Sequence, residues 1–353
     1  MSRAVDAGIA ERLAEAAARG SCYVPEGQGD DVRRALVRRV ARGDVVSPAR
    51  GMFAETDTWL ASKPPARALM IARGLQALHP DWVFCGPTAA LAHGIDVSDA
   101  LTGRTHLAVG ARGCASGTPS LARHRLSSSD GEDPAFEQVA GLRVTPPDQT
   151  VFDCLRWSDF AHGLGVIDSA LRLGLVGAEG IAEFIEGQRG LRRGVDRALA
   201  TLAWADPRSE NGGESIARGR MLLLGYARPE LQVEVPRVVE RGQPYRADYC
   251  WVRTDGAVIL GELDGRVKYV EEELMGGRDI DDVISDENIR GSRFSLYDVS
   301  LVRFRFGVTE RPGDFAALLD EYGVPKRGTP LALPDGVCVT PDWDRLRRRT
   351  GLR

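Results

Sequence analysis

The six cysteines of this 353-residue chain are scattered singly, and no two of them form a CxxC pair. This argues against zinc ribbons, thioredoxin-like redox motifs and disulfide-rich scaffolds, and it makes a reducing cytoplasm the expected location. Long apolar runs are missing as well: stretches such as Met221–Leu224 are far shorter than the ~20 residues that cross a bilayer. We therefore expect no membrane partner.

An excess of charge of one sign is also absent, because 46 Lys and Arg face 50 Asp and Glu, for a net charge of −4. A uniformly basic nucleic-acid-binding surface is excluded, although local basic patches are not. Hydrophobic residues make up 43% and charged residues 27%, which is typical of globular proteins, and the length predicts two or three domains. Acidic residues within a helical pattern at the N-terminus argue against a signal peptide.

The residue patterns predict an α/β (α+β) protein in four stretches. Two helical patterns and a short hairpin occupy residues 1–55, and residues 56–208 alternate short β-like and helical runs. A helix, four extended runs and a closing helix fill residues 209–325, whereas residues 326–353 form a tail rich in proline and arginine. Residues 205–213 are the best candidate linker.

The sharpest candidate site is acidic, and it lies in a predicted hairpin. Arg246-Ala-Asp248 precedes Thr254-Asp255-Gly256, which suits a three-residue turn, and Glu262-Leu-Asp264 follows. With this turn Asp248 lies opposite Glu262, and side-chain alternation puts Asp248, Glu262 and Asp264 on one face. Carboxylates that repel one another are best tolerated when a hard cation such as Mg²⁺ neutralises them.

Two more side chains could complete this acidic site. Glu214 begins a predicted helix and would add a fourth acid, and Lys268, beyond Gly265, could position a water or contact a phosphate. Acids from a helix and a hairpin that converge on one cation predict a metal-assisted phosphodiesterase. The alternative interpretation is that these charges simply face solvent on an edge hairpin.

The second candidate site is a basic helix over residues 30–41. Its apolar residues recur every four positions on one side and its arginines on the other: Val32, Leu36 and Val40 against Arg34, Arg38 and Arg42. A hairpin around Pro48 and Arg50 follows. Such a face could contact DNA phosphates, although a merely solvated basic face would look the same.

The basic helix and the run from Arg42 to Phe53 resemble the winged helix of AbiEi-type antitoxin regulators. The run Thr88-Ala-Ala-Leu-Ala-His93-Gly94 and the stretch from Gly141 to Asp153 resemble the central domain of relatives that carry a C-terminal nuclease-like module. The resemblance implies that the Arg34, Arg38 and Arg42 stripe contacts DNA and that the Arg50 region forms the wing. It also implies a cognate toxin or a second copy as partner. We expect His93 to be structural.

The C-terminal motifs resemble the endonuclease-like module related to very-short-patch-repair nucleases, in the PD-(D/E)XK restriction-endonuclease-like superfamily. They are Glu214-Ser…Arg218, Leu231-Gln232, Arg246-Ala-Asp248 and Gly261-Glu262-Leu-Asp264-Gly-Arg-Val-Lys268-Tyr269. The resemblance implies that Asp248 and Glu262 are the metal ligands and Glu214 the helix acid of the core. Asp264 stands where the superfamily usually has lysine, and Lys268 could substitute for that lysine from further along the chain.

Together these features predict a cytoplasmic, three-part protein with a winged helix, an α/β middle domain and a restriction-endonuclease-like domain. Its expected activity is DNA binding with Mg²⁺-dependent phosphodiester cleavage, in phage defence, a toxin–antitoxin system or DNA repair. The alternative is a non-catalytic transcriptional regulator or type IV antitoxin with a degenerate nuclease fold.

Overall fold

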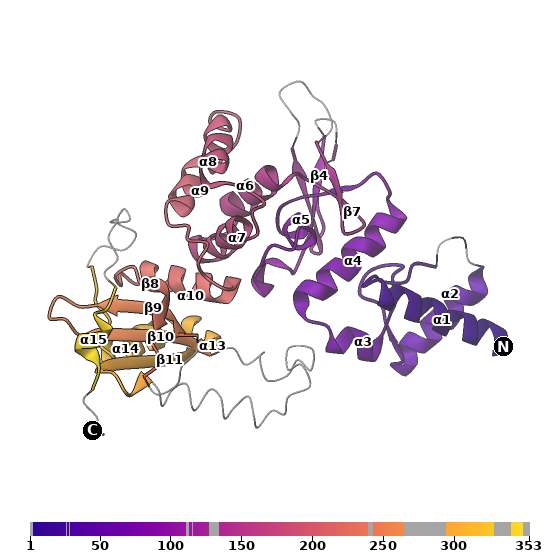
Figure 1. Cartoon of the computed structure of the whole chain (residues 1–353). Helices are drawn as coiled ribbons and strands as arrows, with labels where there is room; N and C mark the ends of the chain where they lie inside the picture. The colour runs from indigo at the N-terminus through magenta and orange to yellow at the C-terminus, as the bar shows by residue number, and fades with distance from the viewer. Residues whose placement is uncertain are drawn as a thin grey trace. The chain divides into compact units, whose positions relative to one another are not determined.

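A computed structural model describes residues 3–25, 27, 29–110, 113–114, 116–126, 134–238, 243–264, 294–327 and 340–348 (Figure 1). Helices and strands are mixed along these residues, which confirms the α/β class. Contacts divide the chain into two compact units, residues 1–159 with 173–199 and residues 160–172 with 200–353. None of the helices described combines the length and apolar character needed to cross a bilayer.

The first unit begins with two helices and a short hairpin. These are α1 (Arg3–Ala18), α2 (Asp30–Arg42) and the antiparallel strands β1 (Val45–Val46) and β2 (Ala54–Glu55). The expected apolar stripe of α2 does face the core, where Leu36 is fully buried. Helix α2 begins after Gly29 and ends before Gly43, whose positive φ of 86° favours glycine.

The rest of the first unit surrounds a five-stranded mixed sheet in the order β5-β4-β3-β7-β6. Its strands are β3 (Val83–Phe84), β4 (Thr105–Val109), β5 (Leu121–Arg125), β6 (Glu137–Val139) and β7 (Leu142–Val144). Its helices are α3 (Thr56–Ala61), α4 (Pro64–Leu78), α5 (Gly86–Ala92), the 3₁₀ turn η1 (Asp99–Leu101), α6 (Pro147–Trp157), α8 (Ala178–Gly187) and most of α9 (Val195–Leu202). The alternation of β-like and helical runs predicted for the middle of the chain is thus confirmed.

The second unit is built on a four-stranded sheet in the order β11-β10-β9-β8. The strands are β8 (Glu230–Val235), β9 (Tyr245–Val252), β10 (Val258–Asp264) and β11 (Val299–Arg305), and only the β10–β11 pair is parallel. The helices are α7 (Phe160–Arg172), α10 (Gly212–Leu223), α13 (Phe306–Thr309), α14 (Pro312–Glu321) and α15 (Trp343–Leu346).

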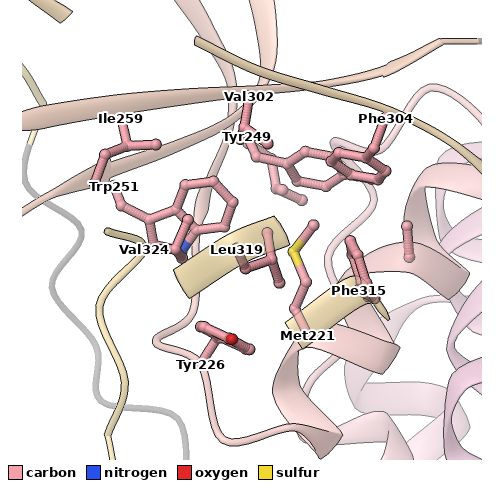
Figure 2. Packing of buried hydrophobic residues seen from close by; sticks show 12 residues of the cluster. Met221, Tyr226, Tyr249, Trp251, Ile259, Val302, Phe304, Phe315, Leu319 and Val324 are labelled. Atoms are coloured by element: carbon pink, nitrogen blue, oxygen red, sulfur yellow. The ribbon is translucent and has the colours of Figure 1, made fainter. Parts of the chain in front are cut away.

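Helices α10 and α14 cover one face of this sheet. Figure 2 shows Met221 of α10 and Phe315 and Leu319 of α14 packed against side chains of the strands. The strand side chains are Tyr249, Trp251, Ile259, Val302 and Phe304. The other face has its own cluster, in which Cys250, Val258 and Leu260 pack with Phe294 and Tyr297. Both faces of β9 and β10 are therefore buried, which accounts for their nearly continuous apolar sequences.

Helix α7 belongs to the second unit because it packs tightly against α10. Gly219 approaches α7 so closely that a Cβ atom there would lie 2.8 Å from the Ala161 Cα. Between the helices, Arg218 donates to Asp168 at 2.6 Å and to the Trp204 carbonyl at 2.8 Å, and both charged side chains are fully buried. Asp168 also accepts the Asp206 N–H at 2.7 Å.

Contacts span two of the boundaries predicted from the sequence. Residues 1–55 share a unit with the middle of the chain, and the Cys22 N–H donates to the Met70 carbonyl at 3.1 Å across the predicted boundary. The boundary predicted near residue 209 would put α7 and α10 in different domains, but the buried Asp168–Arg218 ion pair joins these two helices.

Candidate functional site

The hairpin of β9 and β10 has the turn that its sequence predicts. Gly256 adopts a φ of 83°, and the Arg253 N–H donates to the Ala257 carbonyl at 2.8 Å. The antiparallel register then runs from Val252 opposite Val258 to Tyr249 opposite Gly261. One further step would place Asp248 opposite Glu262, as expected from the sequence.

The backbone hydrogen bonds between β9 and β10 end at that step, and the side chain of Asp248 makes the next contact between the two strands. Its Oδ2 accepts the Leu263 N–H at 2.8 Å, in the place where a backbone carbonyl would continue the ladder. Asp248 thus bridges the two strands where they separate, instead of merely sharing a face with Glu262. This contact fixes a carboxylate beside the end of β10.

Glu262 is buried and ion-paired with an arginine that no sequence motif indicated. In the parallel register Glu262 lies beside Arg303 of β11, whose Nε and Nη2 donate to Oε2 at 2.8 and 2.7 Å. The Glu262 side chain is 4% exposed, whereas Arg303 is 28% exposed. Asp264 is 37% exposed, and its Oδ1 lies 3.9 Å from the same Nε. Glu262 and Asp264 therefore both lie close to Arg303.

Glu214 is tied to the start of α10. Asn211 is the N-cap and accepts the Glu214 N–H at 3.0 Å, while the Glu214 carboxylate accepts from the Glu210 N–H at 2.7 Å and from the Asn211 amide at 2.6 Å. This is close to a capping box, in which both side chains satisfy backbone donors. Gln232 of β8 also donates to Glu214 at 3.2 Å.

The predicted acids are brought to one end of the sheet, but not into one cluster. Leu263 packs in the core that α10 shares, and a Cβ atom at Gly213 would lie 3.5 Å from it. Alternation then directs Glu262 and Asp264 to the other face, away from Glu214. Within the described residues, no three His, Cys, Asp or Glu side chains are grouped to hold a metal ion. Lys268 lies outside the described residues.

The predicted basic residues of the first unit lie at the surface. Arg34 and Arg42 expose 67% and 64% of their side chains, and Arg38 and Arg50 are exposed as well. Arg34 lies 3.5 Å from Asp31 and Arg42 lies 3.2 Å from Asp44, contacts that contribute little to stability at such exposure. Arg34, Arg38 and Arg42 are thus exposed on the side of α2 opposite its buried stripe.

Two histidines of the first unit form a stack that no sequence pattern indicated. His106 of β4 and His124 of β5 are joined by a 3.0 Å contact between Nδ1 and Nε2, and the His124 ring stacks on Trp157 with 3.8 Å between centroids. Burial lowers the pKa of each histidine to about 4, and Arg104 adds to this effect in both. His93, expected to be structural, bonds the Thr145 carbonyl at 2.9 Å.

We expect the stability of the first unit to fall as the pH is lowered from about 6.5 to about 4. Unfolded histidines gain protons below a pKa of about 6.5, whereas His106 and His124 stay neutral in the fold until about pH 4, so protons favour the unfolded chain. Urea unfolding at several pH values should show a steeper fall for the wild type than for His106→Gln/His124→Gln. The same slope in both proteins would contradict this.

Comparisons with known proteins give a partial likeness. No model of a known protein family matches the chain, and no solved structure matches it. Two curated Mycobacterium tuberculosis proteins, from two strains and both described as uncharacterized, are 33% identical to it over 116 residues. The match covers 33% of this chain and 42% of each relative, so the chain spans less than half the length of the curated relatives that it matches.

Proposed function

We propose that this chain is a cytoplasmic DNA-binding protein whose second unit is a Mg²⁺-dependent endonuclease-like domain, acting in phage defence, a toxin–antitoxin system or DNA repair. One observation supports this proposal above the others. Asp248 and Glu262 come from neighbouring strands, and the Asp248 carboxylate bridges the strands at the point where their ladder ends. Two carboxylates that come from adjacent strands at one end of a sheet are suited to binding a cation.

The donor set fits magnesium in its usual mode in nucleases and polymerases. Mg²⁺ prefers oxygen ligands and is commonly bound by one or two carboxylates, with waters and substrate phosphates completing the shell. Asp248 and Glu262 would be these two carboxylates, and Asp264, two residues along the same strand, would orient water. When bound, the metal would polarise the phosphate and activate a water. Lys268 is proposed, from the resemblance alone, to stabilise charge on the phosphate.

Glu214 has a different part in this proposal. Because its carboxylate holds the start of α10, we assign it to positioning the helix against the end of β10 rather than to binding the metal. Asp248 and Glu262 of the strands would then bind the cation, and Glu214 of α10 would help to keep the end of β10 in place.

The proposal is tested by incubating the full chain with supercoiled plasmid and with single-stranded DNA, with and without Mg²⁺ or Mn²⁺. Nicked, linear or shortened products that appear only with the metal are expected. DNA binding without any cleavage, in either metal and on both substrates, would contradict the endonuclease function.

The second candidate is a non-catalytic regulator or type IV antitoxin that uses a degenerate nuclease fold for binding a cognate toxin or a second copy. It is favoured by the Glu262–Arg303 pair, which already compensates the most buried acid of the site, and by the capping contacts of Glu214. Intact DNA binding without cleavage would support this candidate.

Both candidates use the basic side of α2, so replacing Arg34, Arg38 and Arg42 together by Ala should weaken DNA binding. The slope of log affinity against log salt concentration should become less negative by about 0.9 for each phosphate contact that is lost. Loss of two or three contacts should therefore change this slope by about 2 to 3. Fluorescence anisotropy at several salt concentrations would measure it. Folding should be nearly unchanged because these side chains are exposed.

A matched control removes the same charge from another part of the first unit. Arg189, Arg193 and Arg197 are exposed around the start of α9, and their replacement by Ala changes the net charge equally. The control should shift affinity and salt slope much less. Equal effects of the two triple variants would mean that only net charge matters and that α2 is not the DNA contact.

A further inference from the structure

Arg303 of β11 contacts Glu262, one of the two candidate metal ligands, and lies close to Asp264. It reaches them because β11 pairs in parallel with β10, in a register that sets residue 303 beside residue 262. Both contacts of its guanidinium with Glu262, at 2.8 and 2.7 Å, are made to a single oxygen, Oε2. The same guanidinium lies 3.9 Å from Asp264.

A carboxylate as buried as Glu262 requires a compensating charge. Its side chain is 4% exposed, and an ionised carboxyl buried without a partner is costly to fold. Asp264 and Asp248 add further negative charge at the same end of β10. Either a bound divalent cation or the Arg303 guanidinium can compensate this charge, so the two cations act on the same anions.

We propose that Arg303 is the internal counter-ion of the candidate metal site and that it sets the site's affinity for divalent cations. The inference rests on the proposed function, since it assumes that Asp248 and Glu262 bind a metal. In the absence of metal, Arg303 holds the Glu262 carboxylate in position through its two hydrogen bonds. Because cations repel, its charge also weakens metal binding, and a low affinity would let the site respond to the metal concentration.

This role differs from that of an arginine that only stabilises the fold. Loss of a purely structural arginine would lower stability and would weaken or leave unchanged the binding of metal. Loss of a counter-ion lowers the stability of the metal-free protein but makes metal binding tighter. The direction of the change in metal affinity therefore separates the two roles.

The test is a calorimetric titration of the full chain with Mn²⁺ alone, comparing wild type with Arg303→Met and Arg303→Gln. Both variants remove the charge, and Gln retains a hydrogen-bond donor if the Met variant does not fold. We expect the dissociation constant for Mn²⁺ to fall about tenfold or more, the scale on which one neighbouring charge shifts a binding equilibrium. The control Arg253→Met removes an exposed charge paired with Asp255 at the other end of the hairpin, and it should leave the constant unchanged.

The outcomes separate this inference from the proposed function. Mn²⁺ binding by the wild type with an unchanged or weaker affinity in a folded Arg303 variant would overturn the counter-ion role alone. No Mn²⁺ binding by the wild type or by either variant would overturn the proposed metal site itself. Binding that is detected only when Arg303 is replaced would support both.

Discussion

An Arg218→Met variant should have a free energy of unfolding of its second unit about 3–5 kcal/mol below that of the wild type. The substitution leaves the Asp168 carboxylate fully buried between α7 and α10 without the guanidinium that lies 2.6 Å away. It also leaves the Trp204 carbonyl without its 2.8 Å donor. Chemical denaturation followed by tryptophan fluorescence would measure the change, since Trp204 and Trp251 both belong to this unit.

Two further variants show whether the loss of stability comes from the Asp168 charge that is left buried without its partner. Arg218→Met/Asp168→Leu removes both charges and should recover much of the lost stability, because buried ion pairs can often be replaced by apolar residues. Arg311→Met removes an exposed arginine of the same unit, 67% exposed, and should cost little. A loss of under 1 kcal/mol in Arg218→Met, about the value of an exposed pair, would contradict the importance of the buried one.

The second large effect is expected for Glu262→Gln, which should abolish most of the stabilisation that Mg²⁺ or Mn²⁺ confers on the wild type. A cation that binds the folded chain raises its melting temperature by mass action. Gln keeps the size of the side chain and can still accept from Arg303, but it removes the charge that attracts the cation. If the wild type cleaves DNA, the rate should also fall by about 100-fold or more, as when one preorganised electrostatic group is lost.

The control for this variant is Asp255→Asn, which removes the same charge from the turn of the same hairpin. Asp255 lies in the turn, at the other end of the hairpin from Glu262, and its carboxylate accepts the Ala257 N–H at 3.1 Å. Its melting temperature should rise with the metal as the wild type's does. Identical metal responses of Glu262→Gln and the wild type would place any metal site elsewhere.

Local signals in the sequence predicted the hairpin well. Thr254-Asp255-Gly256 identifies the turn because Gly256 can adopt a positive φ, and turn length then determines which residues of β9 and β10 lie opposite each other. The buried stripe of α2 follows in the same way from the spacing of Val32, Leu36 and Val40. In both cases the interacting residues lie within about one turn or one hairpin of the chain.

Contacts between distant segments could not be predicted in this way. Arg303 reaches Glu262 only through the parallel pairing of β10 with β11, and no local turn specifies a parallel register. Glu214 is an acid at a helix start by sequence, but only the packing of Leu263 shows that it lies across the sheet from Glu262. His106 and His124 meet because β4 and β5 pair, although 18 residues separate them.

Helix α7 belongs to the second unit, although the segments before and after it belong to the first. This has a consequence for the chain during its synthesis. Asp168 and Arg218 are 50 residues apart, so at about 5–20 residues per second the ribosome adds Arg218 about 2.5–10 s after Asp168. During that interval the helix that buries α7 is incomplete, whereas the segments on both sides of α7, residues 1–159 and 173–199, belong to the first unit. Slowed translation before α10 would therefore lengthen the time for which α7 lacks its packing partner and is open to chaperones and proteases.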